Sequence, residues 1–120
     1  MKVYHTSVIV LGEERLEISD VTKIVHRAVE ESGVRHGIAI ANALHTTCAL
    51  FINEFQASLV DDLKALIGRL MPPAGIALLG RSVALGVTDG HLVLGRFQSI
   101  IFAELDGPRQ RDIAVQVIGE

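Results

Sequence analysis

The sequence predicts an α+β fold in which about seven strands form a sandwich of sheets, with two helices packed on one side. Three observations predict it. Two stretches carry apolar residues at helical spacing, several others alternate between apolar and polar residues as strands do, and turn residues separate these stretches. A chain of 120 residues rarely divides into two independent cores, so we expect one domain over residues 1–120.

The first third of the chain is predicted to form two strands and a helix. Residues 2–11 alternate as a strand does, and residues 15–18 form a short second strand. Ser19 or Asp20 is expected to cap the following helix at its N-terminus, and Gly33 to end it in the left-handed conformation. The apolar stripe of this helix comprises Val21, Ile24, Val25, Ala28 and Val29.

Residues 35–44 and 47–53 are predicted to be two strands joined around His45-Thr46. In the first of them Ile38 and Ile40 point one way, while the alanines between and after them point the other. The small alanine side chains would let another layer approach closely.

A second helix is predicted over roughly residues 58–70, where leucine, valine and isoleucine recur on one side. Asp61 and Asp62 are expected in its first turn, where the helix dipole favours carboxylates. Pro72-Pro73 is expected to end it.

The last third is predicted to be all strand. Residues 83–87 and 92–94 flank Asp89-Gly90, a strong signal for a two-residue hairpin. Residues 98–105 and 112–118 flank a second reversal at Asp106-Gly107-Pro108-Arg109.

Composition limits the possible partners and location. Apolar residues make up 49% of the chain and mean hydropathy is +0.40, so a monomer this small would leave many aliphatic side chains in water, and self-association would hide them. The net charge of −3 and the lack of a basic run argue against nucleic acid. No segment has the apolar length of a membrane span or a signal peptide, and a single cysteine, Cys48, fits a reducing compartment, so we expect a cytoplasmic protein.

The densest group of reactive side chains extends from His45 to Glu54, followed by Asp62. His45 lies at a strand junction, where its imidazole could bind a metal or transfer protons near neutral pH. Asn53 and Glu54 end the next strand and Asp62 begins a helix, so the four groups could converge. The alternative interpretation is structural: His45 binds neighbouring backbone, and the aspartates serve only the helix N-terminus.

Several segments, in order, resemble the YjbQ-type family, often described as secondary thiamine-phosphate synthases. They are His45-Thr46-Thr47, Ile52-Asn53-Glu54, Asp62-Leu63, Leu79-Gly80-Arg81-Ser82, the stretch from Gly90 to Ile100 with its Phe97-Gln98 pair, and Glu104 to Arg111. Each segment alone is weak evidence for the family, but the ordered set is specific and covers nearly the whole chain.

The resemblance implies a β-sandwich-like α+β fold, a homotrimer and a site around the signature histidine. It also implies a thiamine-phosphate synthase reaction, which joins a pyrimidine diphosphate to a thiazole phosphate. His45 would then be a metal ligand, for Mg²⁺ or Zn²⁺, or an acid–base group, and Asn53, Glu54 and Asp62 would be its catalytic companions. Arg109 and Arg111 could bind the phosphorylated substrate; the alternative is that both are exposed loop residues.

One departure from the family pattern leaves two hypotheses open. The family carries a longer loop after the second helix, with two more histidines, whereas here Pro72-Pro73-Ala74-Gly75 leads directly to Ile76 and no histidine occurs between His45 and His91. Either this member has lost the metal site, or the encoded chain is longer after Gly75. The first hypothesis is therefore a thiamine-phosphate synthase-like enzyme, and the second is a non-catalytic trimeric domain.

Overall fold

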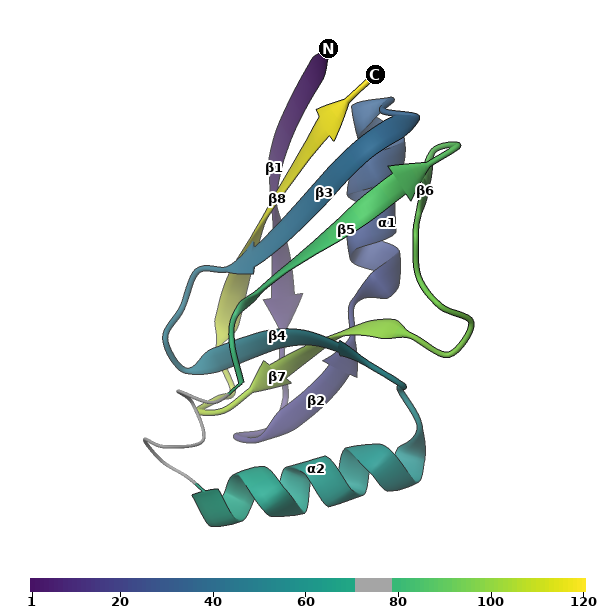
Figure 1. The fold of residues 1–120 in the computed structure, drawn as a ribbon. Helices are drawn as coiled ribbons and strands as arrows, with labels where there is room; N and C mark the ends of the chain where they lie inside the picture. The colour runs from purple at the N-terminus through teal and green to yellow at the C-terminus, as the bar shows by residue number, and fades with distance from the viewer. Residues whose placement is uncertain (71–78) are drawn as a thin grey trace.

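The computed structural model describes residues 1–70 and 79–120, and within them eight strands and two helices confirm the α+β class. Sheet A has five antiparallel strands in the order β1 (Lys2–Leu11), β8 (Gln110–Gly119), β3 (His36–Ala43), β5 (Ser82–Thr88) and β6 (His91–Leu92). Sheet B has three, in the order β2 (Glu17–Asp20), β7 (Ser99–Glu104) and β4 (Cys48–Asn53). The helices are α1 (Thr22–Ser32) and α2 (Ala57–Leu70), and α2 lies along the end of the molecule formed by sheet B (Figure 1).

The main core lies between sheet A, α1 and one face of sheet B. Successive side chains of a strand point to opposite faces of the sheet, so each strand of sheet A directs one set inward. In β3 this set is Ala39, Ala41 and Ala43, all buried. These alanines allow the close layer expected from the sequence. The largest side chains they meet in this core are Leu50 and Phe102 of sheet B.

A second, smaller core lies on the other face of sheet B, under α2. Ile67 is the buried residue of α2, and it packs with Ile101 and Ala103 of β7 and with Ala49 of β4. The two helices therefore border opposite faces of sheet B, and the prediction that they pack on one side was wrong. The continuous buried run of β7, in place of alternation, is the signal for a strand covered on both faces.

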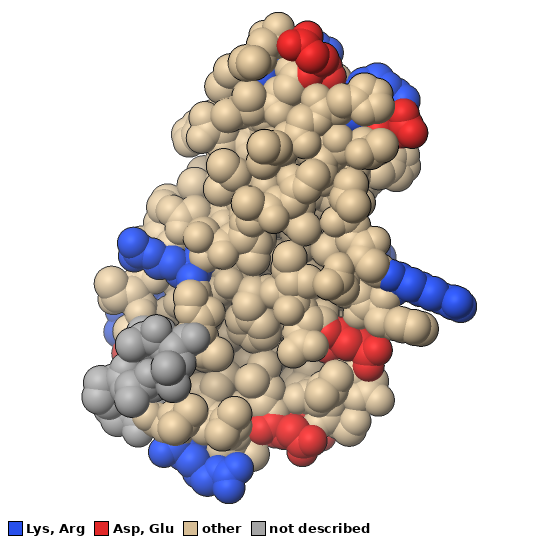
Figure 2. All heavy atoms as spheres, in the orientation of Figure 1, with Lys and Arg blue, Asp and Glu red and all other residues tan. Residues whose placement is uncertain are grey.

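The outer face of sheet A carries large apolar side chains that no other part of the described chain, residues 1–70 and 79–120, covers. Ile38 is 54% exposed, and on the edge strand β1 Ile9 is 55% and Leu11 is 71% exposed. Figure 2 looks onto this face and shows few charged side chains over its centre. A contiguous apolar face of this kind usually marks an interaction site.

The local signals at the turns and caps were mostly accurate. Asp89 and Gly90 both have positive φ, 52° and 79°, which the two-residue hairpin requires, and Gly33 ends α1 with φ 70°. At the start of α1 Val21 occupies the cap position, and the Asp20 carboxylate accepts the N–H of Thr22 at 2.9 Å. The N-cap prediction was therefore off by one residue.

Helix α2 begins at Ala57, slightly earlier than expected, so Asp61 and Asp62 lie beyond its first turn. Gln56 serves the helix start instead, since its side-chain oxygen accepts the N–H of Leu59 at 3.2 Å. The proline stop after α2 falls on residues outside the described part of the chain. No helix in the described ranges is long and apolar enough to span a membrane.

Candidate functional site

His45 lies in the short loop between β3 and β4, and its ring is bound to the first part of β8. The backbone N–H of Asp112 donates to Nε2 of His45 at 3.2 Å, and the same nitrogen lies 3.6 Å from the Asp112 carboxylate. Because Nε2 accepts a hydrogen bond, a neutral ring must carry its proton on Nδ1. The His45 side chain is 33% exposed, so the ring combines a fixed orientation with access from outside.

A buried ion pair lies next to this loop. Arg111 donates from Nε and Nη2 to the two carboxylate oxygens of Glu104, at 2.7 and 2.6 Å, and from Nη2 to the Thr47 hydroxyl at 2.7 Å. Both partners are almost fully buried, at 2% and 3% exposure. The backbone N–H of Asp106 adds a further bond to Glu104, at 3.1 Å. The pair therefore connects the β4 start to β7 and β8.

The pKa directions follow from these contacts. Burial alone would raise the pKa of the Glu104 carboxyl, but the bonds from Arg111 and from the Asp106 N–H outweigh it and hold the pKa below its ordinary value. The hydrogen bond to Glu104 raises the pKa of Arg111, so its charge is permanent. Burial raises the pKa of the Cys48 thiol, against the opposing effect of Arg111, which fits a small buried side chain better than a nucleophile.

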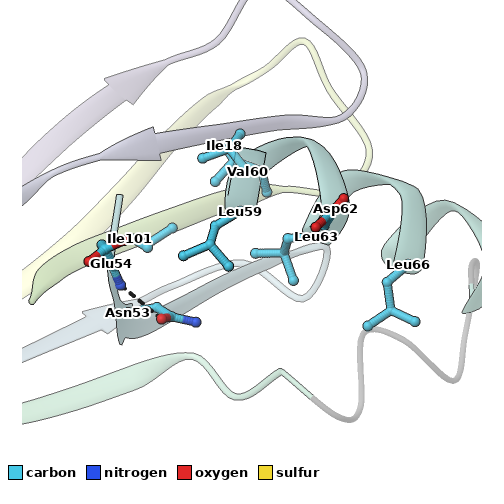
Figure 3. A pocket seen from close by; sticks show the side chains of 9 residues that line it. All are labelled: Ile18, Asn53, Glu54, Leu59, Val60, Asp62, Leu63, Leu66 and Ile101. Atoms are coloured by element: carbon cyan, nitrogen blue, oxygen red, sulfur yellow. Dashed lines mark hydrogen bonds between the residues drawn. The ribbon is translucent and has the colours of Figure 1, made fainter. Parts of the chain in front are cut away.

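The other three candidate residues line a different place, a pocket of about 210 Å³ between α2 and sheet B (Figure 3). Asn53, Glu54 and Asp62 supply its polar groups, and the Asn53 side-chain oxygen accepts the N–H of Glu54 at 2.8 Å. Its remaining lining residues are apolar: Ile18, Leu59, Val60, Leu63, Leu66 and Ile101. The expected neighbourhood of these three groups is therefore observed.

The structure does not bring His45 to this pocket within one chain. His45 precedes the first residue of β4, whereas Asn53 is the last residue of that strand. A strand rises about 3.3 Å per residue, so β4 alone separates its two ends by roughly 16 Å. The four groups can act together only if a second copy of the chain brings one half to the other.

The two arginines expected to bind substrate differ from each other. Arg109 is exposed, and its Nη2 lies 3.7 Å from the Asp106 carboxylate, so the guanidinium remains accessible. Arg111 is neither an exposed loop residue nor open to a ligand, because its bonds to Glu104 and Thr47 bury it.

Sequence reasoning missed Asp112 and Glu104, the partners of His45 and Arg111. For Glu104 there was a signal: a carboxylate that continues a wholly apolar strand needs a buried cation. Asp112 carried no such signal, because it begins a strand as many surface carboxylates do.

The described residues do not fit a metal centre within one chain. No group of three or more histidine, cysteine or carboxylate side chains is placed to hold an ion in residues 1–70 and 79–120. At His45 only one carboxylate is close, and the ring nitrogen that faces it already accepts a backbone N–H. Zinc needs three or four protein ligands, so the expected Mg²⁺ or Zn²⁺ site has too few donors here.

The chain is a small α+β domain of two antiparallel sheets, in which α1 packs in the main core, α2 covers the other face of sheet B, and a histidine is held in the loop between β3 and β4. Residues 7–120 match the model of the UPF0047, YjbQ-like family, and the chain belongs to that family. A UPF0047 protein of Methanothermobacter thermautotrophicus is 35% identical, over 100% of this chain and 95% of its own length. YugU of Bacillus subtilis, another UPF0047 protein, is 28% identical over 88% of this chain and 92% of its own.

Solved structures match the fold over almost its full length. A crystal structure of a protein of unknown function from Sulfolobus solfataricus has a TM-score of 0.92 and 32% identity, and covers 99% of both chains. A hypothetical protein from Aeropyrum pernix has a TM-score of 0.90 at 30% identity, over 97% of this chain and 98% of its own.

The family match bears on the expected loop. The Methanothermobacter relative aligns over 136 residues although this chain has 120, so the alignment contains positions at which this chain has no residue. The sequence predicts a segment after α2 that is shorter than the loop of the family. That segment, with Pro72-Pro73 and Gly75, lies outside the described residues.

Proposed function

We propose that the protein is a homotrimeric enzyme of thiamine-phosphate synthase type, cytoplasmic, in which His45 acts at the edge of a subunit interface. The observation that carries the proposal is the fixed, partly exposed His45 ring, with Nε2 bound by the Asp112 N–H and Nδ1 making no hydrogen bond in the described part of the chain. A group held in this way is pre-organised to donate from Nδ1.

The reaction needs such a donor. The thiazole nitrogen forms a bond to the methylene carbon of the pyrimidine substrate, the carbon–oxygen bond to diphosphate breaks, and the diphosphate leaves with the electron pair. The Nδ1–H of His45 would donate a hydrogen bond to the leaving oxygen and stabilise its developing charge. The exposed guanidinium of Arg109 would bind the remaining phosphate oxygens.

The uncovered outer face of sheet A supports self-association. Asp112 lies on β8 opposite Ile9 of β1, so the His45–Asp112 pair borders the exposed apolar side chains. Packing this face against another copy would remove them from water. The same contact is the means by which the pocket at Asn53, Glu54 and Asp62 of one copy could reach His45 of another. The subunit number of three rests on the family resemblance.

The test has two arms. Purified protein is assayed with both phosphorylated precursors and magnesium, and thiamine phosphate should form; His45→Ala should abolish it, whereas His91→Ala, which removes an exposed hairpin histidine, should not. Light scattering measures the assembly, which should be a trimer in the wild type and a monomer in Ile38→Asp. Turnover that is unchanged by His45→Ala would remove His45 from the mechanism.

A second candidate is a non-catalytic trimeric domain. The observation that favours it is that Arg111, which precedes the His45 partner Asp112 on β8, is bonded to Glu104 and cannot bind a substrate. This candidate expects the same trimer but no turnover and no stoichiometric metal. Elemental analysis of the purified trimer, together with the turnover assay, separates the two.

A further inference from the structure

A crevice of about 290 Å³ lies between the edge strand β1 and helix α1, and neither His45 nor the residues of the pocket under α2 line it. Its apolar lining residues are Val8, Ile9, Ile24 and Ala28, and its polar groups are Thr6, Lys23, Arg27 and Glu31. One water occupies about 30 Å³ of liquid, so the crevice has room for roughly ten waters or a small organic molecule.

The charged groups of the crevice are distributed unequally. Lys23 and Arg27 are four residues apart on α1 and therefore share one helix face. Neither makes an ion pair with a carboxylate in residues 1–70 or 79–120. Glu31, at the other end, accepts a hydrogen bond from the Tyr4 hydroxyl at 2.9 Å. The crevice thus holds two cations that form no ion pair within the described part of the chain, although the chain has a net charge of −3.

The position of Lys23 strengthens this argument. It is the second residue of α1, where the helix dipole favours an anion and disfavours a cation. The first turn contains no acidic residue, and the Asp20 carboxylate that precedes it is bonded to Thr22. A lysine here adds to the positive potential of the helix start. With Arg27 one turn later and the Thr6 hydroxyl opposite, the crevice presents two cationic donors and a hydroxyl around an apolar floor.

We propose that this crevice binds a small phosphorylated molecule, with Lys23 and Arg27 on the phosphate and the organic part over Val8, Ile24 and Ala28. Arg and Lys are the side chains that bind phosphate by charge-assisted hydrogen bonds. The confined volume favours a small ligand over a peptide. The proposed site contains neither His45 nor Arg111 and does not depend on the function proposed for His45. Arg111 could not bind this phosphate, because it is buried against Glu104.

The experiment titrates inorganic pyrophosphate into the protein without magnesium and follows backbone amide shifts by NMR. Shifts should concentrate at Thr6, Val8, Ile24 and Ala28 and saturate at one ligand per chain. Lys23→Gln/Arg27→Gln should weaken binding by roughly a hundredfold, since each of the two lost charge-assisted contacts is typically worth about tenfold. The matched control, Arg96→Gln, removes an exposed arginine outside the crevice and should leave the affinity unchanged.

The outcomes are distinct. No binding of pyrophosphate at millimolar concentration, or equal weakening by the control, would overturn the proposal. Shifts centred on His45 and Asp112 would overturn it too while supporting the first site, and binding of an acidic peptide in place of pyrophosphate would replace it with a protein-docking surface. Because all these variants change exposed side chains, circular dichroism suffices to verify that each is folded.

Discussion

Removing the guanidinium of Arg111 should be the most damaging single change outside the apolar core. In Arg111→Met the Glu104 carboxylate loses both of its bonds to the guanidinium and keeps the Asp106 N–H, in a position that is 2% exposed. Leaving one partner of a buried ion pair uncompensated costs about 3–5 kcal/mol. With a urea m-value of about 2 kcal/mol/M, the midpoint should fall by about 2 M.

The double variant Glu104→Met/Arg111→Met should recover much of this loss, because it removes both charges and fills the space with apolar atoms. Arg96→Met is the control, since Arg96 is exposed and its guanidinium lies over the ring of Phe97, 5.4 Å from the centroid. Urea unfolding followed by circular dichroism at one protein concentration measures all four proteins. A loss below about 1 kcal/mol in the single variant would refute the argument.

The same pair predicts a pH dependence with a definite sign. The folded pKa of Glu104 is below its ordinary value, so its stabilising contribution is complete above the unfolded pKa of about 4.3 and is lost as the pH falls through the folded pKa. In Arg111→Met the buried carboxyl should instead have a raised pKa, so acid should reduce the penalty. The midpoints of wild type and variant should therefore converge between pH 7 and pH 4, and parallel curves would contradict the assignment.

Four substitutions test the packing by urea unfolding. Ile67→Ala should cost about 2–5 kcal/mol because Ile67 is the buried residue of α2, whereas Leu66→Ala, at a side chain that is 46% exposed, should cost less than about 1; equal losses would place α2 differently. Gly37→Ala should destabilise, by about 1–3 kcal/mol or more, because its Cβ would overlap the Ile118 carbonyl. Gly68→Ala, where the added carbon has no neighbour within 4 Å beyond the backbone of its own helix among residues 1–70 and 79–120, should stabilise α2 by roughly 0.5–1 kcal/mol, and a loss would contradict this.

The local elements of the fold could be predicted because each has a short-range physical cause. The apolar spacing of α1, the positive φ at Asp89-Gly90 and the left-handed Gly33 depend on a few consecutive residues. The distribution of strands between sheets depends on distant pairing and could not be predicted in this way. β7 and β8 are separated only by a short reversal, yet β7 pairs with β2 and β4 while β8 pairs with β1 and β3.

The grouping of His45 with Asn53, Glu54 and Asp62 could have been tested against strand geometry before any coordinates existed. Residues 47–53 were expected to be extended, and an extended segment of that length holds its ends about 20 Å apart. Groups placed before and after one strand therefore converge only through a sharp bend, which this strand lacks, or through another copy of the chain. β4 pairs continuously with β7 from Cys48 to Asn53, which indicates an extended strand, so joint action of the full set would require assembly. Loss of turnover in the monomeric Ile38→Asp variant, with a circular dichroism spectrum that shows the variant to be folded, is the result that this reasoning requires.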